Sequence, residues 1–349
     1  MSHRDHIQTG NICGGISLYL DKKIAVVVAC YNEETQISGV LSTMPEFVDS
    51  IVVVDDASTD KTFEVVSRNR LNDTRIVILQ HDKNSGVGAA IATGYRYALN
   101  NGYDVVAVMG GDGQMDPNDL EAVVRPVAEG LADYCKGNRF FYPQGVKRIP
   151  RYRLLGNFVL SAYTKIVSCY WHISDTQSGY TAIGRDALLS MDIDKIYPRY
   201  GCPNDILTKL NIAEMRVAEV PVNPLYNVGE SSKMKIPRVI LPISMLLVRL
   251  FFYRMFHKYI FRTGHPLVLA YALSALLFFL FCLLGVYIFV VLLITGEIPK
   301  AALIVSGVTL IIALQLLVTA FTMDFDYNKN LFVRLKRSRP MFSMDDYKK

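Results

Sequence analysis

The sequence predicts an α/β domain with a mostly parallel sheet, followed by amphipathic interface helices and a two-helix transmembrane hairpin. Two observations predict this order. Short apolar runs alternate with helix-length amphipathic segments in the first part of the chain, which is typical of parallel strands covered by helices on both faces. Two uncharged apolar segments, 267–294 and 301–323, come later, and each is long enough for a helix that spans a membrane, which needs roughly 20 residues.

The elements expected in the first domain alternate regularly. Strands are expected at 24–30, 50–56, 75–80 and 104–109, and helices at 34–44, 59–70 and 86–100. The strand segments are apolar throughout rather than alternating, which indicates burial on both faces of the sheet. We therefore expect an N-terminal extension at 1–22 and the α/β domain at 23–230.

Polar residues gather where the first, second and fourth of these strands end. They are Tyr31, Asn32, Glu33, Asp55, Asp56, Asp112 and Gln114. Parallel strands point their carboxyl ends to one edge of a sheet, and ligands bind beyond that edge. The sequence therefore predicts a polar binding site there.

Two common nucleotide sites are disfavoured by their missing motifs. The first strand is not followed by GxGxxG, and the chain holds no GxxxxGK[ST], so a dinucleotide-binding enzyme and a P-loop enzyme are both disfavoured. Gly86 and Gly88 instead open the helix after the third strand. They predict a close approach of the backbone to a phosphate or a sugar at the start of that helix.

The net charge of +5 is unevenly divided. Residues 1–230 hold 22 Lys and Arg against 27 Asp and Glu, whereas residues 231–349 hold 15 against 5. With 51% hydrophobic and 20% charged residues, the composition excludes a disordered chain or a nucleic-acid-binding tail. We expect no nucleic acid partner, and an acidic domain joined to a basic part that faces lipid.

The basic part predicts how the chain meets the membrane. Residues 231–265 are expected to form basic amphipathic helices in the lipid interface, although an ordinary amphipathic helix packed on the domain is the alternative. The hairpin is expected at 266–323 and a basic tail at 324–349. Seven Lys and Arg precede the hairpin, seven follow it and one lies in its loop, so the catalytic domain and both termini are expected in the cytoplasm.

Five motifs in order carry a family resemblance. They are VVVACYNEE, VVVDDASTDKT, NSGVGAA, MGGDGQMDP and DTQSGYTAIGRDAL. The chain resembles the family 2 glycosyltransferases with a Rossmann-like GT-A fold and, over about residues 23–322, the dolichyl- or polyprenyl-phosphate hexose synthases among them.

The resemblance implies a donor site that binds a nucleotide sugar and a divalent cation, Mg²⁺ or Mn²⁺. The residues implied for the nucleotide are Ala29, Tyr31, Asn32, Glu33, Asp55, Asp56, Gly86, Gly111, Asp112, Gly113 and Gln114. Asp112 and Gln114 are also the implied metal ligands. Gly110 replaces the first aspartate of the family's metal motif, and Val87 stands where relatives often have lysine.

The resemblance also implies an acceptor site for a polyprenyl phosphate. Arg139, Arg153, Ser232 and Lys233 match the positions expected to bind its phosphate, and the implied catalytic residues are Asp112, Asp175, Asp205 and Arg139. A phosphate acceptor is already ionised at pH 7, so it requires no strong general base. Asp175 and Asp205 are therefore interpreted as orienting groups.

The implied function is an inverting transfer of hexose from a UDP- or GDP-sugar to undecaprenyl or dolichyl phosphate, on an integral membrane protein. A processive polysaccharide synthase is one alternative, but the chain has no QxxRW motif and a single hairpin. A non-catalytic, membrane-anchored binding protein is another, favoured by Gly110 and Val87. The sugar, the nucleotide, the lipid carrier and the formation of a homo-oligomer stay open at this point.

Overall fold

The computed structural model describes residues 19–141, 151–225 and 236–335. The chain forms two compact units. The first holds the chain up to Leu250 and again from Asn330 onward, and the second is Phe251–Lys329. Of the segment 324–349, which is expected as a basic tail, residues 324–329 belong to the second unit, and the first unit resumes at residue 330.

The first half of the sheet follows the expected alternation. β1 (Ile24–Cys30), β2 (Ser50–Asp55), β3 (Ile76–Gln80) and β4 (Val105–Gly110) pair in parallel. The helices between them are α1 (Ile37–Ser42), α2 (Thr62–Asn72) and α3 (Val87–Asn100). Almost every residue of β1 and β2 is buried, which explains why these strands are continuously apolar.

The second half of the sheet is mixed. Its strands are β5 (Tyr134–Asn138), β6 (Thr181–Gly184), β7 (Val217–Pro221) and β8 (Phe332–Val333). The full order is β3-β2-β1-β4-β6-β5-β7-β8, in which β6 is antiparallel to both β4 and β5. The fold is thus a GT-A-like, mostly parallel sheet, which confirms the expected fold class.

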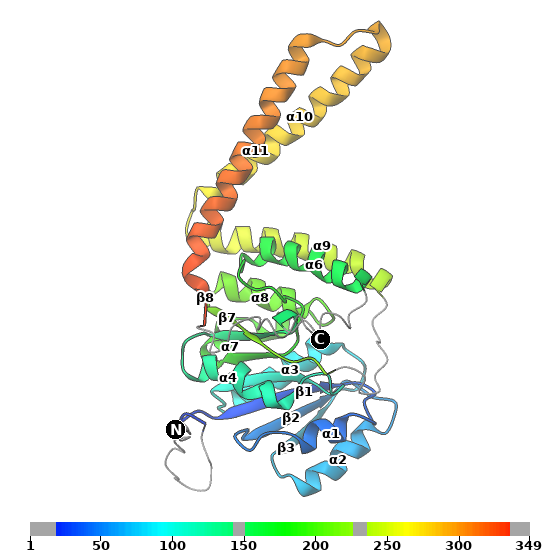
Figure 1. The fold of residues 1–349 in the computed structure, drawn as a ribbon, viewed down its shortest axis with the longest axis vertical. Helices are drawn as coiled ribbons and strands as arrows, with labels where there is room; N and C mark the ends of the chain where they lie inside the picture. Colours follow the sequence, from blue (N-terminus) through cyan, green and yellow to red (C-terminus); the bar gives the residue numbers. More distant parts are fainter. Residues whose placement is uncertain (1–18, 142–150, 226–235, 336–349) are drawn as a thin grey trace, which may run out of the picture. The chain divides into compact units, whose positions relative to one another are not determined.

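Helices cover both faces of the sheet (Figure 1). The elements that connect the remaining strands are η1 (Pro117–Asp119), α4 (Leu120–Ala128), η2 (Arg139–Phe141), α6 (Arg151–Ser168), α7 (Arg185–Ser190), η3 (Ile193–Lys195), α8 (Cys202–Ile212) and α9 (Ile236–Arg254). Alternate β1 residues enter two cores, with Ile24 and Val26 against α1, α2 and α4, and Ala25 and Val27 against α3, α7 and α8.

The second unit is a helical hairpin. The π-helix η4 (Met255–Arg262) leads to α10 (Leu267–Thr295), and α11 (Lys300–Asn328) returns beside it (Figure 1); the short η5 (Lys329–Leu331) then leads to β8. Gly296 makes the turn with a φ of +73°, a conformation that glycine adopts without strain. Helices Ile240–Arg262, Leu267–Thr295 and Lys300–Leu331 are each long and apolar enough to cross a membrane. The chain is therefore an integral membrane protein.

Candidate active site

The loops after β1 and β2 are tied together at the carboxyl edge of the sheet. Asn32 adopts a φ of +54°, its backbone N–H donates to Ser58 Oγ at 3.0 Å, and its Oδ1 accepts from the backbone N–H of Thr59 at 2.8 Å. The backbone N–H of Glu33 donates to Thr62 Oγ1 at 2.8 Å. The segment 31–33 expected at the nucleotide is thereby held by the loop that follows Asp55 and Asp56.

The two aspartates after β2 are both buried, and each binds a neighbouring loop. Asp55 accepts from the hydroxyl and the backbone N–H of Ser58 and, at 3.2 Å, from Gln80 Nε2. Asp56 accepts from the backbone N–H groups of Ser85 at 2.8 Å and Gly86 at 2.7 Å. These carboxylates hold the loops after β2 and β3 in place, and their expected contact with base or ribose stays a prediction.

The glycines that open α3 lie against the chain segment at Tyr197 and Pro198. A Cβ at Gly86, where φ is +100°, would lie 2.4 Å from the carbonyl oxygen of Pro198, and one at Gly88 would lie 2.0 Å from that of Tyr197. The backbone N–H groups of Gly88 and Ala89 both donate to Pro198, at 2.8 and 3.1 Å. The glycines therefore allow a close approach of the chain to itself, and the expected approach to a phosphate or a sugar at this helix start stays a prediction.

The turn after β4 brings Asp112 and Gln114 to the end of β1. The backbone N–H of Gly111 donates to the carbonyl of Ala29 at 3.0 Å, and Gly113 adopts a φ of +72°. Asp112 Oδ1 accepts from the backbone N–H of Gln114 at 3.1 Å.

Gly110, which departs from the family's metal motif, lies beside Asp112 in the same turn. A Cβ at Gly110 would lie 2.9 Å from Asp112 Oδ1, so a side chain there would require the end of the Asp112 side chain to shift. Asp116, two residues beyond Gln114, accepts from the backbone N–H of Asn118 at 2.9 Å and caps η1.

Arg139 and Asp175, both expected at the acceptor site, form an ion pair in which Asp175 is buried and Arg139 is partly exposed. Asp175 is 0% exposed and accepts from Arg139 Nε at 2.7 Å, from Nη2 at 3.0 Å and from its backbone N–H at 3.2 Å. Burial alone would raise the pKa of Asp175, but the guanidinium of Arg139 holds it below its usual value. The geometry therefore supports an orienting role for Asp175.

Lys136 and Glu219 complete this charge cluster and were missed from the sequence. The two residues are register partners on β5 and β7. Glu219 Oε1 accepts from the backbone N–H groups of Ser174 at 2.7 Å and Asp175 at 2.9 Å, and burial raises its pKa. Lys136 Nζ donates to the carbonyl of Ser178 at 2.7 Å, and burial lowers its pKa to about 8. The sequence alone does not show that these opposite charges lie next to each other, because this depends on the pairing of β5 with β7.

Asp205 lies on α8 and holds the segment that meets α3. It is buried, and its Oδ2 accepts from the backbone N–H of Tyr197 at 2.8 Å and from Lys209 Nζ at 2.7 Å. This geometry positions the chain at Pro198. Of the other expected acceptor residues, Arg153 lies within α6 but its side chain falls outside the described residues, as do Ser232 and Lys233.

The sheet edge offers a metal few protein ligands. Within residues 19–141, 151–225 and 236–335, no three His, Cys, Asp or Glu side chains gather in a way that could hold a metal ion. Asp112 and Gln114 supply one carboxylate and one amide. Hard oxygen donors of this kind suit Mg²⁺ or Mn²⁺ when substrate phosphates and water complete the shell.

Comparison with known proteins identifies the family. Residues 25–190 match the description "Glycosyl transferase family 2". An uncharacterized protein of Methanocaldococcus jannaschii is 31% identical over 205 residues, which are 58% of this chain and 82% of that protein. The chain belongs to glycosyltransferase family 2.

Two further relatives of the chain are named for their activities. The UDP-N-acetylglucosamine–dolichyl-phosphate N-acetylglucosaminyltransferase of Methanococcus voltae is 29% identical over 59% of this chain and 87% of its own length. The undecaprenyl-phosphate mannosyltransferase of Micrococcus luteus is 28% identical over 57% and 82%. Among solved structures, glucosyl-3-phosphoglycerate synthase of Mycobacterium tuberculosis shares the fold, with a TM-score of 0.50 and 16% identity over 67% of this chain and 80% of that one.

Proposed function

We propose that this glycosyltransferase moves a hexose, with inversion, from a nucleoside-diphosphate sugar to a polyprenyl phosphate. The observation that carries the proposal is the placement of Asp112 where β1, β2 and β4 end, in a family 2 domain whose chain continues into an apolar hairpin. The relatives named for dolichyl and undecaprenyl phosphate support this class of acceptor.

The chemistry asks for positioning and charge stabilisation more than for proton transfer. An acceptor phosphate oxygen, already ionised, forms a bond to the anomeric carbon while the bond from that carbon to the donor diphosphate breaks, and the nucleoside diphosphate keeps the electron pair. Asp112 and Gln114 would hold a divalent cation. When bound, this cation offsets the charge that develops on the leaving diphosphate.

Cationic side chains on the acceptor side would bind the lipid phosphate. Arg139 keeps 30% of its side chain exposed while Asp175 orients its guanidinium, and a planar guanidinium suits phosphate oxygens. Arg153, Ser232 and Lys233 complete the proposed acceptor site. The basic flanks of the hairpin support a cytoplasmic catalytic domain and cytoplasmic termini.

Membranes that contain the full chain test the proposal. They are given a panel of radiolabelled UDP- and GDP-hexoses with undecaprenyl or dolichyl phosphate, and the lipid product is identified by mass spectrometry. We expect one lipid-linked monosaccharide, formed only with a divalent cation. A polymer would instead favour a processive synthase, and nucleotide binding without any product would favour a binding protein.

The metal ligand has a matched control in the same turn. Asp112→Asn should abolish the cation-dependent product because it removes the charge beside the diphosphate. Asp116→Asn removes a carboxylate that caps η1 and should retain cation dependence. Undiminished product from Asp112→Asn would refute the role of Asp112.

A further inference from the structure

One amide side chain lies within the apolar part of the hairpin. Between Lys300 and Asp324, Gln315 is the only residue with a side-chain amide or a charge, and α10 has none. Along α11, which is long and apolar enough to cross a membrane, Gln315 is 15 residues from Lys300 and 9 from Asp324, or about 22 Å and 14 Å. Since the hydrocarbon core of a bilayer is roughly 30 Å thick, this amide lies among acyl chains.

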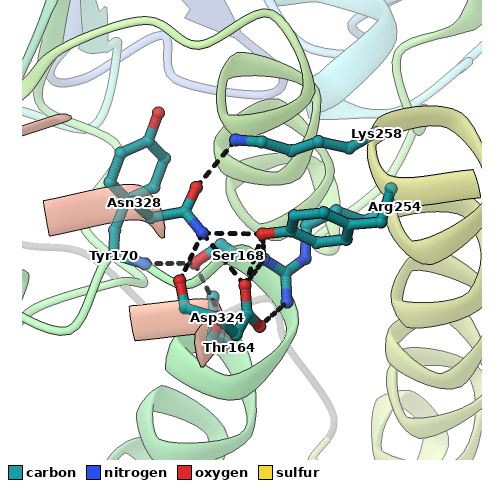
Figure 2. A network of polar contacts seen from close by, with 8 residues as sticks. Thr164, Ser168, Tyr170, Arg254, Lys258, Asp324 and Asn328 are labelled. Atoms are coloured by element: carbon teal, nitrogen blue, oxygen red, sulfur yellow. Dashed lines mark hydrogen bonds and ion pairs between the residues drawn. The ribbon is translucent and has the colours of Figure 1, made fainter. Parts of the chain in front are cut away.

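The charged groups at the base of the hairpin are paired with one another (Figure 2). Arg254 donates to both carboxylate oxygens of Asp324, at 3.0 and 2.6 Å. Lys258 Nζ donates to Asn328 Oδ1 at 2.7 Å. All four residues are buried, so the hairpin pairs its polar groups internally where it excludes solvent, as buried polar groups require.

The face of α11 that packs on α10 is satisfied in the same way. Ser306 and Thr309 are buried on this face, the hydroxyl of Thr309 donates to the carbonyl of Val305 at 2.8 Å, and Ser274 of α10 donates to the carbonyl of Ala313 at 2.9 Å. The two helices therefore hold each other without a contribution from the amide of α11.

The amide of Gln315 differs from all these groups. Its side chain is exposed and has no hydrogen-bond partner in the part of the chain that the structure describes. An amide without a partner is costly in hydrocarbon, because acyl chains neither donate nor accept hydrogen bonds. Gln315 therefore needs a partner that the described residues do not supply.

Gln315 is at the middle of one exposed, uncharged face of α11. The residues of this outer face are Ile304, Val308, Ile311, Gln315, Thr319 and Thr322. They are three or four positions apart, which is the spacing of one side of a helix. The hydroxyls of Thr319 and Thr322 donate to backbone carbonyls one turn earlier, at 2.8 and 2.9 Å. Apart from Gln315, every residue of the face is branched at Cβ, so its side chain loses little freedom when it packs.

A second copy of the chain fits the outer face. Copies inserted into one membrane in the same orientation run their α11 helices in parallel and place Gln315 at the same depth. A carboxamide both donates and accepts, and in a two-fold symmetric contact a residue meets its own counterpart. Two Gln315 amides can therefore satisfy each other. The face has no charge, so nothing in it repels the second copy.

We infer that two copies of the chain associate within the membrane through the outer face of α11, with Gln315 of each copy hydrogen-bonded to its counterpart. Interhelical hydrogen bonds and close packing are the forces that hold helices together in lipid, and this face offers both. The inference goes beyond the proposed transfer reaction and does not depend on it.

Disulfide cross-linking tests which face forms the contact. Cys13 and Cys282 are replaced by serine in the full chain, and single cysteines are introduced into α11 and oxidised in membranes. Ile311→Cys tests the outer face. Val305→Cys and Leu314→Cys are matched controls, since both residues are exposed and apolar but lie about 90° to either side of the face.

Ile311→Cys should give at least fivefold more cross-linked product than either control, and the product should have twice the mass of the chain. Equal yields at the three positions would overturn the inference, because they indicate random collision. A product that joins the chain to a different protein would overturn it as well, because the face would then serve another partner.

Gln315→Leu tests the amide itself. The change keeps a side chain of similar size and makes the helix more apolar, so insertion into the membrane should be retained. Energy transfer between copies labelled at Glu297→Cys in the same serine background reports association as the protein is diluted in lipid vesicles. Gln315→Leu should raise the protein-to-lipid ratio at half-association about fivefold, whereas Gln315→Asn and the control Leu314→Ala should change it by less than about twofold. An unchanged ratio in Gln315→Leu would refute pairing through the amide.

Discussion

Replacement of Asp175 by asparagine tests whether Asp175 orients the guanidinium of Arg139 at the proposed acceptor site. The change keeps the side-chain volume and removes one negative charge. Asp175 accepts three N–H groups of Arg139 and is fully buried. The neutral amide of the Asp175→Asn variant would leave the guanidinium beside Lys136 without its counter-charge.

The cost follows from burial and geometry. Loss of one partner of a fully buried ion pair costs about 3–5 kcal/mol, but Arg139 is 30% exposed, and water solvates part of the charge that remains. We therefore expect the free energy of unfolding to fall by about 2–3 kcal/mol. A guanidinium displaced by about 1 Å should lower kcat/KM for lipid transfer on the order of 100-fold.

Asp133→Asn is the matched control. Asp133 and Arg216 form a similar two-pronged pair, at 2.9 and 3.2 Å, before the amino ends of β5 and β7, with side chains 26% and 45% exposed. This pair should contribute at most about 1 kcal/mol and nothing to transfer. Urea unfolding and initial transfer rates are measured for both variants. Equal transfer rates for Asp175→Asn and Asp133→Asn would refute the orienting role.

Three further predictions concern stability. Burial lowers the pKa of His172 from 6.5 to about 4, so on acidification the unfolded chain binds a proton at this residue before the folded chain does. The free energy of unfolding should therefore fall by about 2–3 kcal/mol between pH 7 and pH 4.5. In urea titrations at the two pH values, His172→Phe should remove most of this loss. Gly88→Ala would place a Cβ 2.0 Å from a backbone carbonyl and should lower Tm by several degrees, whereas Gly39→Ala, with nothing within 4 Å, should not lower it. Arg254→Asp and Asp324→Arg should each reduce the yield of folded protein in detergent, and the double variant should restore it if the pair joins the two helices; no recovery would argue against that pairing.

The first half of the fold could be predicted closely because it repeats one unit. β1 occupies 24–30 as expected, and α3 begins one residue later than expected and ends at the same residue. Strands buried on both faces are apolar at every position, so their limits are visible in the sequence alone. The rule that ligands bind beyond the carboxyl ends of parallel strands then located the polar edge.

The second half depends on contacts that are distant in sequence. The five-residue strand β5 contains Lys136 and a glycine. The charge of Lys136 is explained by Glu219, its partner on the neighbouring strand β7. β8 is two residues long and lies beyond the hairpin. Local patterns contain neither the pairing nor the antiparallel β6, so these strands and the cluster that they build were not predicted.

The carboxylates at the candidate site differ in which segments of the chain donate hydrogen bonds to them. Asp55, Asp56, Asp175 and Asp205 each accept a hydrogen bond from a segment other than their own, and Asp112 accepts one from the backbone N–H of Gln114 within its own turn. The first four therefore fix the mutual positions of loops before substrate arrives, which reduces the reorganisation that the reaction requires. It follows that substitutions at these four should lower stability and transfer together.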